Sequence, residues 1–214
     1  MFDHDRSDAE TAELVKEWLA RHLPVIFAGI AIALLIIFGM KWWDKRALEA
    51  NYRLSYQIDT LEKAVAAKND AAVNAAYTAD LKADKSNYGA LAALLFAQHQ
   101  QQQGKTQEAI TALEKAGTAS DTLIAQTAQW QLAHVKIGAK DFDGAMQALN
   151  SLEHSVYQSQ LPLLRGDIDY LRGNSEAALK HYQQSQAQQA SPLLATRIRQ
   201  LETQIALQSA QETQ

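Results

Sequence analysis

The pattern of apolar and polar residues divides the chain into one continuous apolar run and a series of amphipathic segments. Residues 23–40 contain no charged side chain, and eleven of these eighteen positions are Leu, Ile, Val or Phe. As a helix, this run is about 27 Å long, close to the roughly 30 Å hydrocarbon core of a bilayer. Trp42 and Trp43 follow at once, where the aromatic belt of a membrane helix lies. We therefore predict a transmembrane anchor at residues 23–43.

A buried core helix and a cleaved signal peptide are the two alternatives to an anchor. Residues 1–22 are rich in Asp and Glu, and no small-residue cleavage site lies between the apolar run and the tryptophans. These features disfavour a signal peptide, and the length of the run favours a single uncleaved span over a core helix. Lys and Arg are nearly equally frequent on the two flanks, with a slight excess that favours a cytoplasmic C-terminal side. The sequence alone therefore does not orient the span.

The acidic tail at residues 1–22 has some helical pattern of its own. Ser7 and Glu10 have the spacing of a capping box, and Leu14 and Trp18 lie on one face of a helix. Either a short amphipathic helix lies at the membrane surface before Pro24 turns the chain, or the membrane helix simply extends into the tail. Both alternatives stay open.

The remainder, residues 44–214, shows helical periodicity and no alternating run of β-branched residues. Short connections with turn residues, such as Gly104-Lys105 and Gly173-Asn174, separate the helical segments. The sequence therefore predicts an all-α soluble domain built from helical hairpins. The predicted helices lie at 44–67, 70–82, 88–103, 106–117, 124–138, 142–153, 161–172, 175–187 and 193–209.

Three segments of this domain align with one another at steps of 36 and 33 residues. In the alignment, the first helix of each hairpin has a small residue at the same position, and a turn residue follows it. The second helix then has a small residue and, four positions later, a large one. In that order the aligned sets are Ala97, Ala133 and Gly166; Gly104, Lys140 and Gly173; Ala109, Ala145 and Ala178; and Leu113, Leu149 and Tyr182. This pattern resembles the tetratricopeptide repeat, whose period is 34. The resemblance implies a right-handed helical solenoid.

The helices on either side of these repeats have separate predicted roles. Residues 47–82 are expected to form a helical pair that starts the stack or links it to the anchor. In residues 193–209, Leu194, Ile198, Leu201 and Ile205 share one face, as in a helix that caps the last repeat.

Composition and motifs argue against catalysis. The chain has no cysteine, which excludes disulfides, thiol nucleophiles and cysteine metal sites, and its net charge of −4 disfavours a large nucleic-acid footprint. No phosphate-binding, dinucleotide-binding, zinc-protease or nucleophile-elbow motif occurs, and no two of the six histidines are three or four residues apart. We expect no enzymatic activity, no cofactor and no metal.

A binding surface is therefore the expected functional feature. In tetratricopeptide repeats the first helix of each pair lines a concave groove, and Trp130 and Tyr170 would be its aromatic anchors here. For Trp130, packing between helices is an equally good interpretation. A lysine that holds a peptide carboxylate in some such repeats is replaced by Leu94 and Trp130, which argues against that binding mode. The resemblance places these residues in the groove: Leu94, Gln98, Gln101, Trp130, His134, Asp167 and Tyr170.

The whole chain is similar to the YfgM-like family of ancillary SecYEG translocon subunits. The resemblance rests on the acidic tail, the single span, the tryptophan pair, the string at 87–98 (NYGALAALLFAQ) and the degenerate repeats. It implies a bacterial inner-membrane protein with a cytoplasmic N-terminus and periplasmic repeats. It also implies association with SecYEG and with a membrane-anchored, PpiD-like prolyl isomerase chaperone, so that emerging proteins pass to periplasmic chaperones. A scaffold of another envelope assembly complex, and less plausibly a membrane-bound hydrolase, are the alternatives.

Overall fold

A computed structural model describes residues 5–77 and 80–212, although several side chains between positions 5 and 47, among them those of 23–28 and 30, lie outside the description. The chain divides into two compact units, Met1–Arg53 and Leu54–Gln214. In the described residues both units are helical, as the sequence predicts.

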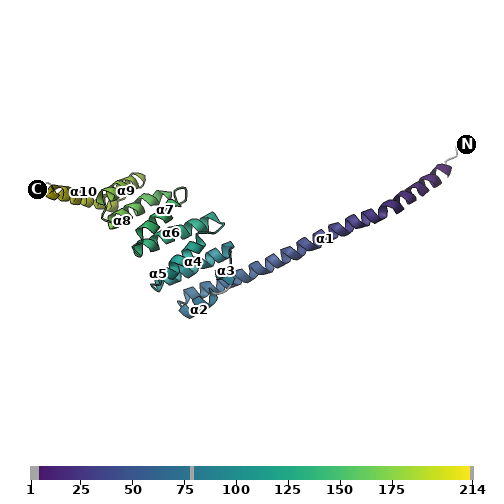
Figure 1. The fold of residues 1–214 in the computed structure, drawn as a ribbon, viewed down its shortest axis with the longest axis horizontal. Coiled ribbons are helices and arrows are strands. Elements are labelled where there is room, and N and C mark those ends of the chain that lie inside the picture. The colour runs from purple at the N-terminus through teal and green to yellow at the C-terminus, as the bar shows by residue number, and fades with distance from the viewer. Residues whose placement is uncertain (1–4, 78–79, 213–214) are drawn as a thin grey trace. The chain divides into compact units, whose positions relative to one another are not determined.

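The first unit consists of most of α1, a single helix that runs from Asp5 to Ala66 (Figure 1). The helix continues past Pro24, so in its secondary structure the tail is an extension of the helix that follows it. Its large apolar side chains between positions 32 and 43 are all solvent-exposed, from 48% at Leu34 to 72% at Leu35 and Trp43. Among the residues and side chains described, no helix has the length and apolar content required to cross a bilayer. Part of the predicted span, 23–28 and 30, lies outside the described side chains.

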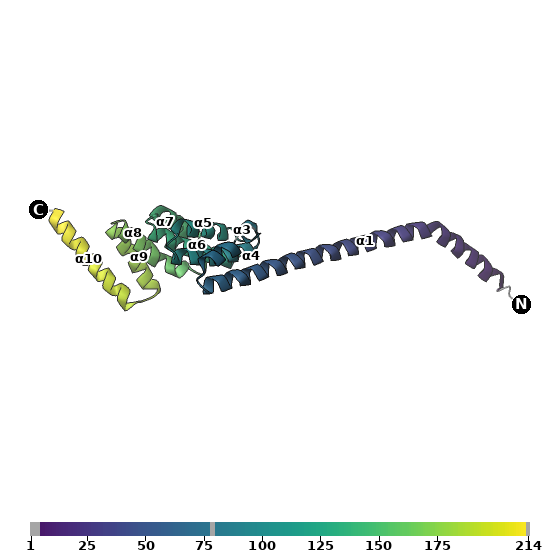
Figure 2. The same cartoon turned by 90° about the horizontal axis from the view of Figure 1, so that it is seen from below.

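The second unit is a succession of helical hairpins formed by the end of α1 and the helices that follow (Figures 1 and 2). Each helix from α4 to α9 packs against the next one in the chain, and α10 packs on α9. The helices after α1 are α2 (Asp70–Ala76), α3 (Asp80–Ala83), α4 (Asn87–Gln102), α5 (Thr106–Ala116), α6 (Thr122–Gly138), α7 (Phe142–Asn150), the 3-10 helix η1 (Gln158–Gln160), α8 (Leu161–Leu171), α9 (Ser175–Gln188) and α10 (Pro192–Glu212).

Four turns of one geometry separate the two helices of each hairpin. At each turn one residue has a positive φ: Lys68 (52°), Gly104 (70°), Lys140 (61°) and Gly173 (83°). The next residue donates its backbone N–H to the carbonyl five residues earlier, as in a Schellman cap, over 2.8 to 3.1 Å. The predicted turns are thus confirmed. The turn at Lys68 lies between the predicted helices 44–67 and 70–82, and it makes the end of α1 and α2 the first hairpin of the series, as expected of a helical pair that starts the stack.

The residues aligned in sequence occupy equivalent places in the core. The aligned residues within the helices are buried in the interior of the stack, whereas the aligned turn residues are exposed. The buried set includes Ala97, Ala133, Ala109, Ala145 and Ala178 and the larger Leu113, Leu149 and Tyr182. Gly166 is buried as well, and a Cβ placed there would lie 2.6 Å from the Tyr182 ring. Small residues therefore allow the close helix contacts that the repeat pattern predicts.

Two details differ from the prediction. The segment 70–82 contains two short helices, because α2 ends at Ala76 and α3 begins at Asp80. The 3-10 helix η1 precedes α8 and was not expected. The predicted cap is confirmed, since Leu194 and Leu201 of α10 are buried in a cluster with Ala178 and Tyr182, and Ile198 and Ile205 pack against that cluster.

Candidate partner-binding face

The seven residues predicted to bind a partner come from the first helices of three successive hairpins. α4 carries Leu94, Gln98 and Gln101, α6 carries Trp130 and His134, and α8 carries Asp167 and Tyr170. Leu94, Trp130 and Asp167 are half-buried, whereas the other four are exposed. We call the surface formed by these residues the A-helix face. Whether a partner binds there stays a prediction.

Trp130 packs against the core and is at the same time half-buried on the A-helix face. Its ring stacks on Tyr157, with centroids 4.9 Å apart and an interplanar angle of 7°, and it packs against the main core cluster. The Tyr157 hydroxyl lies 3.3 Å from the Thr127 hydroxyl, which fixes the position of the stacked pair. A half-buried, immobilised indole offers contact area to a partner at little entropic cost. Half of the Tyr170 surface is exposed, so its ring is held less firmly than the Trp130 ring.

His134 and Asp167 give the face its electrostatic character. The His134 ring meets the edge of Trp130 at a centroid distance of 4.9 Å and an angle of 75°. Burial lowers the pKa of His134, and the Asp167 carboxylate partly opposes that shift. Asp167 is already engaged within the chain, because it accepts hydrogen bonds from the Tyr182 hydroxyl (2.8 Å) and from Arg197 (2.7 Å). The charge of Asp167 is therefore largely compensated within the chain.

The common turn geometry reveals two residues that the sequence analysis missed, Ile58 and Leu163. Ten residues before each positive-φ residue stands a large apolar side chain: Ile58, Leu94, Trp130 and Leu163. All four are partly or largely exposed, and together they form an apolar row across four hairpins. The register of the turns carried the signal, since Leu163 stands ten residues before the predicted turn at Gly173 and Ile58 ten residues before Lys68.

The string that carries the family resemblance has a structural role at the start of α4. It reads Asn87-Tyr88-Gly89-Ala90-Leu91-Ala92. The Asn87 side chain accepts hydrogen bonds from the Ser120 hydroxyl (2.9 Å) and the Asp121 backbone N–H (3.1 Å), which ties α4 to the cap of α6. A Cβ at Gly89 would lie 2.2 Å from the Asp84 carbonyl oxygen. Glycine is thus required there by close backbone approach.

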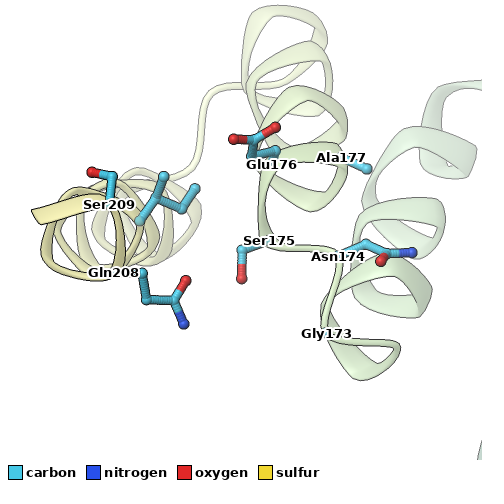
Figure 3. Close-up of a pocket in the computed structure, with 8 residues that line it drawn as sticks. Gly173, Asn174, Ser175, Glu176, Ala177, Gln208 and Ser209 are labelled. Atoms are coloured by element: carbon cyan, nitrogen blue, oxygen red, sulfur yellow. The ribbon is translucent and has the colours of Figure 1, made fainter. Parts of the chain in front are cut away.

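Cavities occur elsewhere on the second unit. One of about 450 Å³ lies between the start of α9 and the end of α10, where Ser175 and Glu176 lie across from Gln208 and Ser209 (Figure 3). Its lining is mainly polar, and none of the seven predicted residues contributes to it. In the described part of the chain no group of three His, Asp or Glu side chains is placed to hold a metal ion. The A-helix face offers apolar contact and hydrogen bonding, which suit the binding of a polypeptide.

Stacked helical hairpins with an apolar row on their first helices define a class of protein-interaction repeat. The chain belongs to the tetratricopeptide repeat-like domain family, whose match covers residues 16–203. It is also similar over most of its length to proteins named Ancillary SecYEG translocon subunit. The one from Aggregatibacter actinomycetemcomitans is 28% identical over 185 residues, covering 80% of this chain and 85% of the relative. The one from Escherichia coli is 21% identical over 191 residues, covering 88% and 91%. The resemblance to the YfgM-like family is therefore confirmed.

Proposed function

We propose that this chain is a single-pass inner-membrane subunit of the SecYEG translocon that links emerging proteins to periplasmic chaperones. The observation that carries the proposal is similarity over at least four-fifths of the chain to ancillary SecYEG translocon subunits. The tetratricopeptide repeat-like family is non-catalytic, so the function is one of binding.

The membrane anchor at 23–43 rests on two observations. The apolar run at 23–40 has no charge, and the apolar side chains described beyond position 31 are exposed around the whole helix. A helix that is apolar on every side requires a protein core or a bilayer around it. The Arg46 guanidinium lies 4.3 Å from the Trp42 ring centroid, which is a suitable pairing for the headgroup region.

The proposal includes the orientation that the family resemblance implies, with the N-terminus in the cytoplasm and the repeats in the periplasm. Two proteins anchored in one membrane meet at a high effective concentration, so weak contacts suffice for capture. The A-helix face supplies such contacts to a PpiD-like chaperone through the apolar row and Tyr170. The anchor supplies the contact with SecYEG.

Capture of the chaperone from mild detergent tests this proposal. Replacing Trp130 and Tyr170 by Ala should weaken capture more than tenfold, about 1.4 kcal/mol. Because Trp130 also packs on the core, Leu163→Ser with Tyr170→Ser is the cleaner variant: both side chains are exposed, at 38% and 50%. The matched control is Leu171→Ser with Leu193→Ser. These two leucines are exposed at 55% and 80% and are not among the residues assigned to the A-helix face. Unchanged capture by both A-helix variants, with intact helical content, would remove the face from the proposal.

A further inference from the structure

Two adjoining cavities at the first two hairpins share a wall made by Lys82 of α3 and Lys115 of α5. The larger one, about 630 Å³, lies among α2, α3, α4 and α5 and has a mainly apolar lining. The smaller one, about 380 Å³, is lined by Lys85 and Thr118 among others. We call them the apolar cavity and the basic cavity. None of the seven residues of the A-helix face lines either of them.

Two stacked aromatic rings form part of the apolar cavity. Tyr77 and Phe96 lie with their centroids 4.1 Å apart and their planes 17° from parallel. The Lys115 ammonium is 5.8 Å from the Tyr77 ring centroid and donates to the Leu81 carbonyl oxygen at 2.6 Å. A rigid aromatic surface beside a fixed ammonium group suits a ligand that is apolar at one point and anionic at the next.

The next hairpin provides an internal comparison. Phe96, Thr111, Ala112 and Lys115 correspond, 36 residues later, to Leu132, Gln147, Ala148 and Ser151, which also line a cavity. That cavity is only about 260 Å³. Lys136 lines it and is paired with Glu114 at 3.4 Å and Asp141 at 3.8 Å. The stacked aromatic wall, in which Tyr77 is 6% exposed and Phe96 is half-buried, and a lysine at the position of Lys115 therefore belong to the first cavity and not to the repeat in general.

The charge around the basic cavity is predominantly positive. Lys82, Lys85 and Lys115 line it together with one carboxylate, Asp84. Asp84 is occupied in capping α4, since it accepts hydrogen bonds from the Ser86 hydroxyl and from the Gly89 N–H (2.8 Å). Burial lowers the pKa of Lys115; Asp84 opposes the shift and Lys82 adds to it. Among the described residues, Glu108 is the one carboxylate that lines the apolar cavity. With three lysines against Asp84 and Glu108, the combined site is net positive and attracts anions, in a chain whose net charge is −4.

We propose that the apolar and basic cavities together bind an acidic segment of a partner protein. One large apolar side chain of the segment lies against Tyr77 and Phe96, and the carboxylates next to it pair with Lys82 and Lys85. The site is separate from the A-helix face and does not depend on which machine the protein serves.

A labelled peptide, Gly-Ser-Glu-Asp-Trp-Glu-Gly-Ser with fluorescein at its N-terminus, tests the proposal by fluorescence anisotropy on the full chain in detergent micelles. Binding should weaken at least tenfold in Lys82→Glu with Lys85→Glu, two exposed positions, and in Thr111→Trp, which fills the apolar cavity. The matched controls are Lys180→Glu with Arg199→Glu, which changes the net charge equally, and Gln147→Trp at the equivalent place in the next hairpin. Both controls should bind the peptide as the parent does.

Three results would each overturn the site. The lysine variant and its charge control could bind equally well, so that the position of the charges does not matter. The peptide with Gly in place of Trp could bind as tightly, so that only net attraction operates. The Leu163→Ser and Tyr170→Ser variant could lose the peptide as strongly as the lysine variant, which would place the peptide on the A-helix face. None of these measurements involves the translocon, so failure here is distinct from failure of the proposed function.

Discussion

At the scale of single residues, Gly166 and Tyr182 form a pair in which the absence of a side chain at one position makes room for the large ring at the other. Where the first two aligned hairpins have Ala with Leu, the last has Gly with Tyr, and the Tyr182 ring occupies the space of the missing methyl group. The Tyr182 hydroxyl also donates to Asp167, which links the core to the A-helix face.

Gly166→Ala should therefore destabilise the repeats by about 1–3 kcal/mol, because the new Cβ overlaps the ring. Denaturant unfolding followed by circular dichroism measures the change. Tyr182→Leu should remove most of the penalty in the double variant, which a double-mutant cycle detects. Gly138→Ala, where nothing lies within 4 Å of the new Cβ, is the control and should be neutral or slightly stabilising. Equal effects at Gly166 and Gly138 would contradict the packing argument.

Asp70 is a carboxylate whose ionisation makes the stability of the fold depend on pH. It accepts hydrogen bonds from Lys105 (2.9 Å) and from the fully buried His99 (3.1 Å). These two groups hold the pKa of Asp70 below its usual value. A lowered folded-state pKa means that the stabilisation is complete above the unfolded pKa and is lost as pH falls through the folded one.

Between about pH 6 and about pH 3, the parent should therefore lose more stability than Asp70→Asn, in which the titrating group is absent. Urea midpoints at the two pH values measure the difference. Glu176→Gln, an exposed carboxylate of α9, is the control and should follow the parent. Parallel losses in the parent and in Asp70→Asn would show that the pairing in the first hairpin does not contribute.

At the scale of helices and turns, the sequence predicted most elements because periodicity and turn chemistry agreed. Apolar spacing located the helices, and Gly104 and Gly173 marked two turns by their freedom to adopt positive φ. The first hairpin was expected from the break between the predicted helices at 44–67 and 70–82, although Lys68 carries no compositional signal for its positive φ. The break between α2 and α3 was missed because no Gly or Pro lies between positions 70 and 82.

The candidate binding surfaces were less predictable than the helices, because the periodicity of a sequence does not report how side chains of different helices pack together. The seven residues of the A-helix face were correctly assigned to first helices, because turn spacing fixes their register. The cavity beside Tyr77 and Phe96 joins side chains from different hairpins, and its size depends on packing that periodicity does not report. Trp130 could not be assigned to core or surface from spacing alone, since it belongs to both.

The turns themselves permit a direct test of the left-handed conformation. Lys140→Gly should stabilise the repeats by about 0.5–1 kcal/mol, because glycine adopts a φ of 61° without the Cβ penalty. Gly104→Ala should destabilise them by about 1 kcal/mol for the converse reason, with no steric contribution, since nothing lies within 4 Å of the new Cβ. Thermal unfolding of the parent, Lys140→Gly and Gly104→Ala ranks the three proteins by stability. A neutral Gly104→Ala would show that the turn tolerates the change by altering its geometry.

At the scale of the whole molecule, the second unit contains its own core. Buried residues run from Leu61 in α1 to Leu201 in α10, so the hairpins do not depend on the first unit for burial of their apolar faces. A fragment of residues 45–214 should therefore be soluble and helical without detergent. Sedimentation and circular dichroism measure this. An aggregating fragment, or one with a strand-type spectrum, would contradict the modular organisation.

The central claim, that the apolar segment of α1 connects the protein to the translocon, is tested most directly by quantifying SecY that co-purifies in mild detergent. Gly29, Ala31, Ala33 and Gly39 offer small surfaces for close helix contact in lipid. Among the described residues, a Cβ added at Gly29 or Gly39 would meet nothing within 4 Å outside the neighbouring backbone of its own helix. Exchanging residues 23–40 for an unrelated membrane span should lower the recovered SecY more than tenfold, while chaperone capture by the repeats persists. Recovery of SecY at the parent level with the exchanged span would contradict the claim.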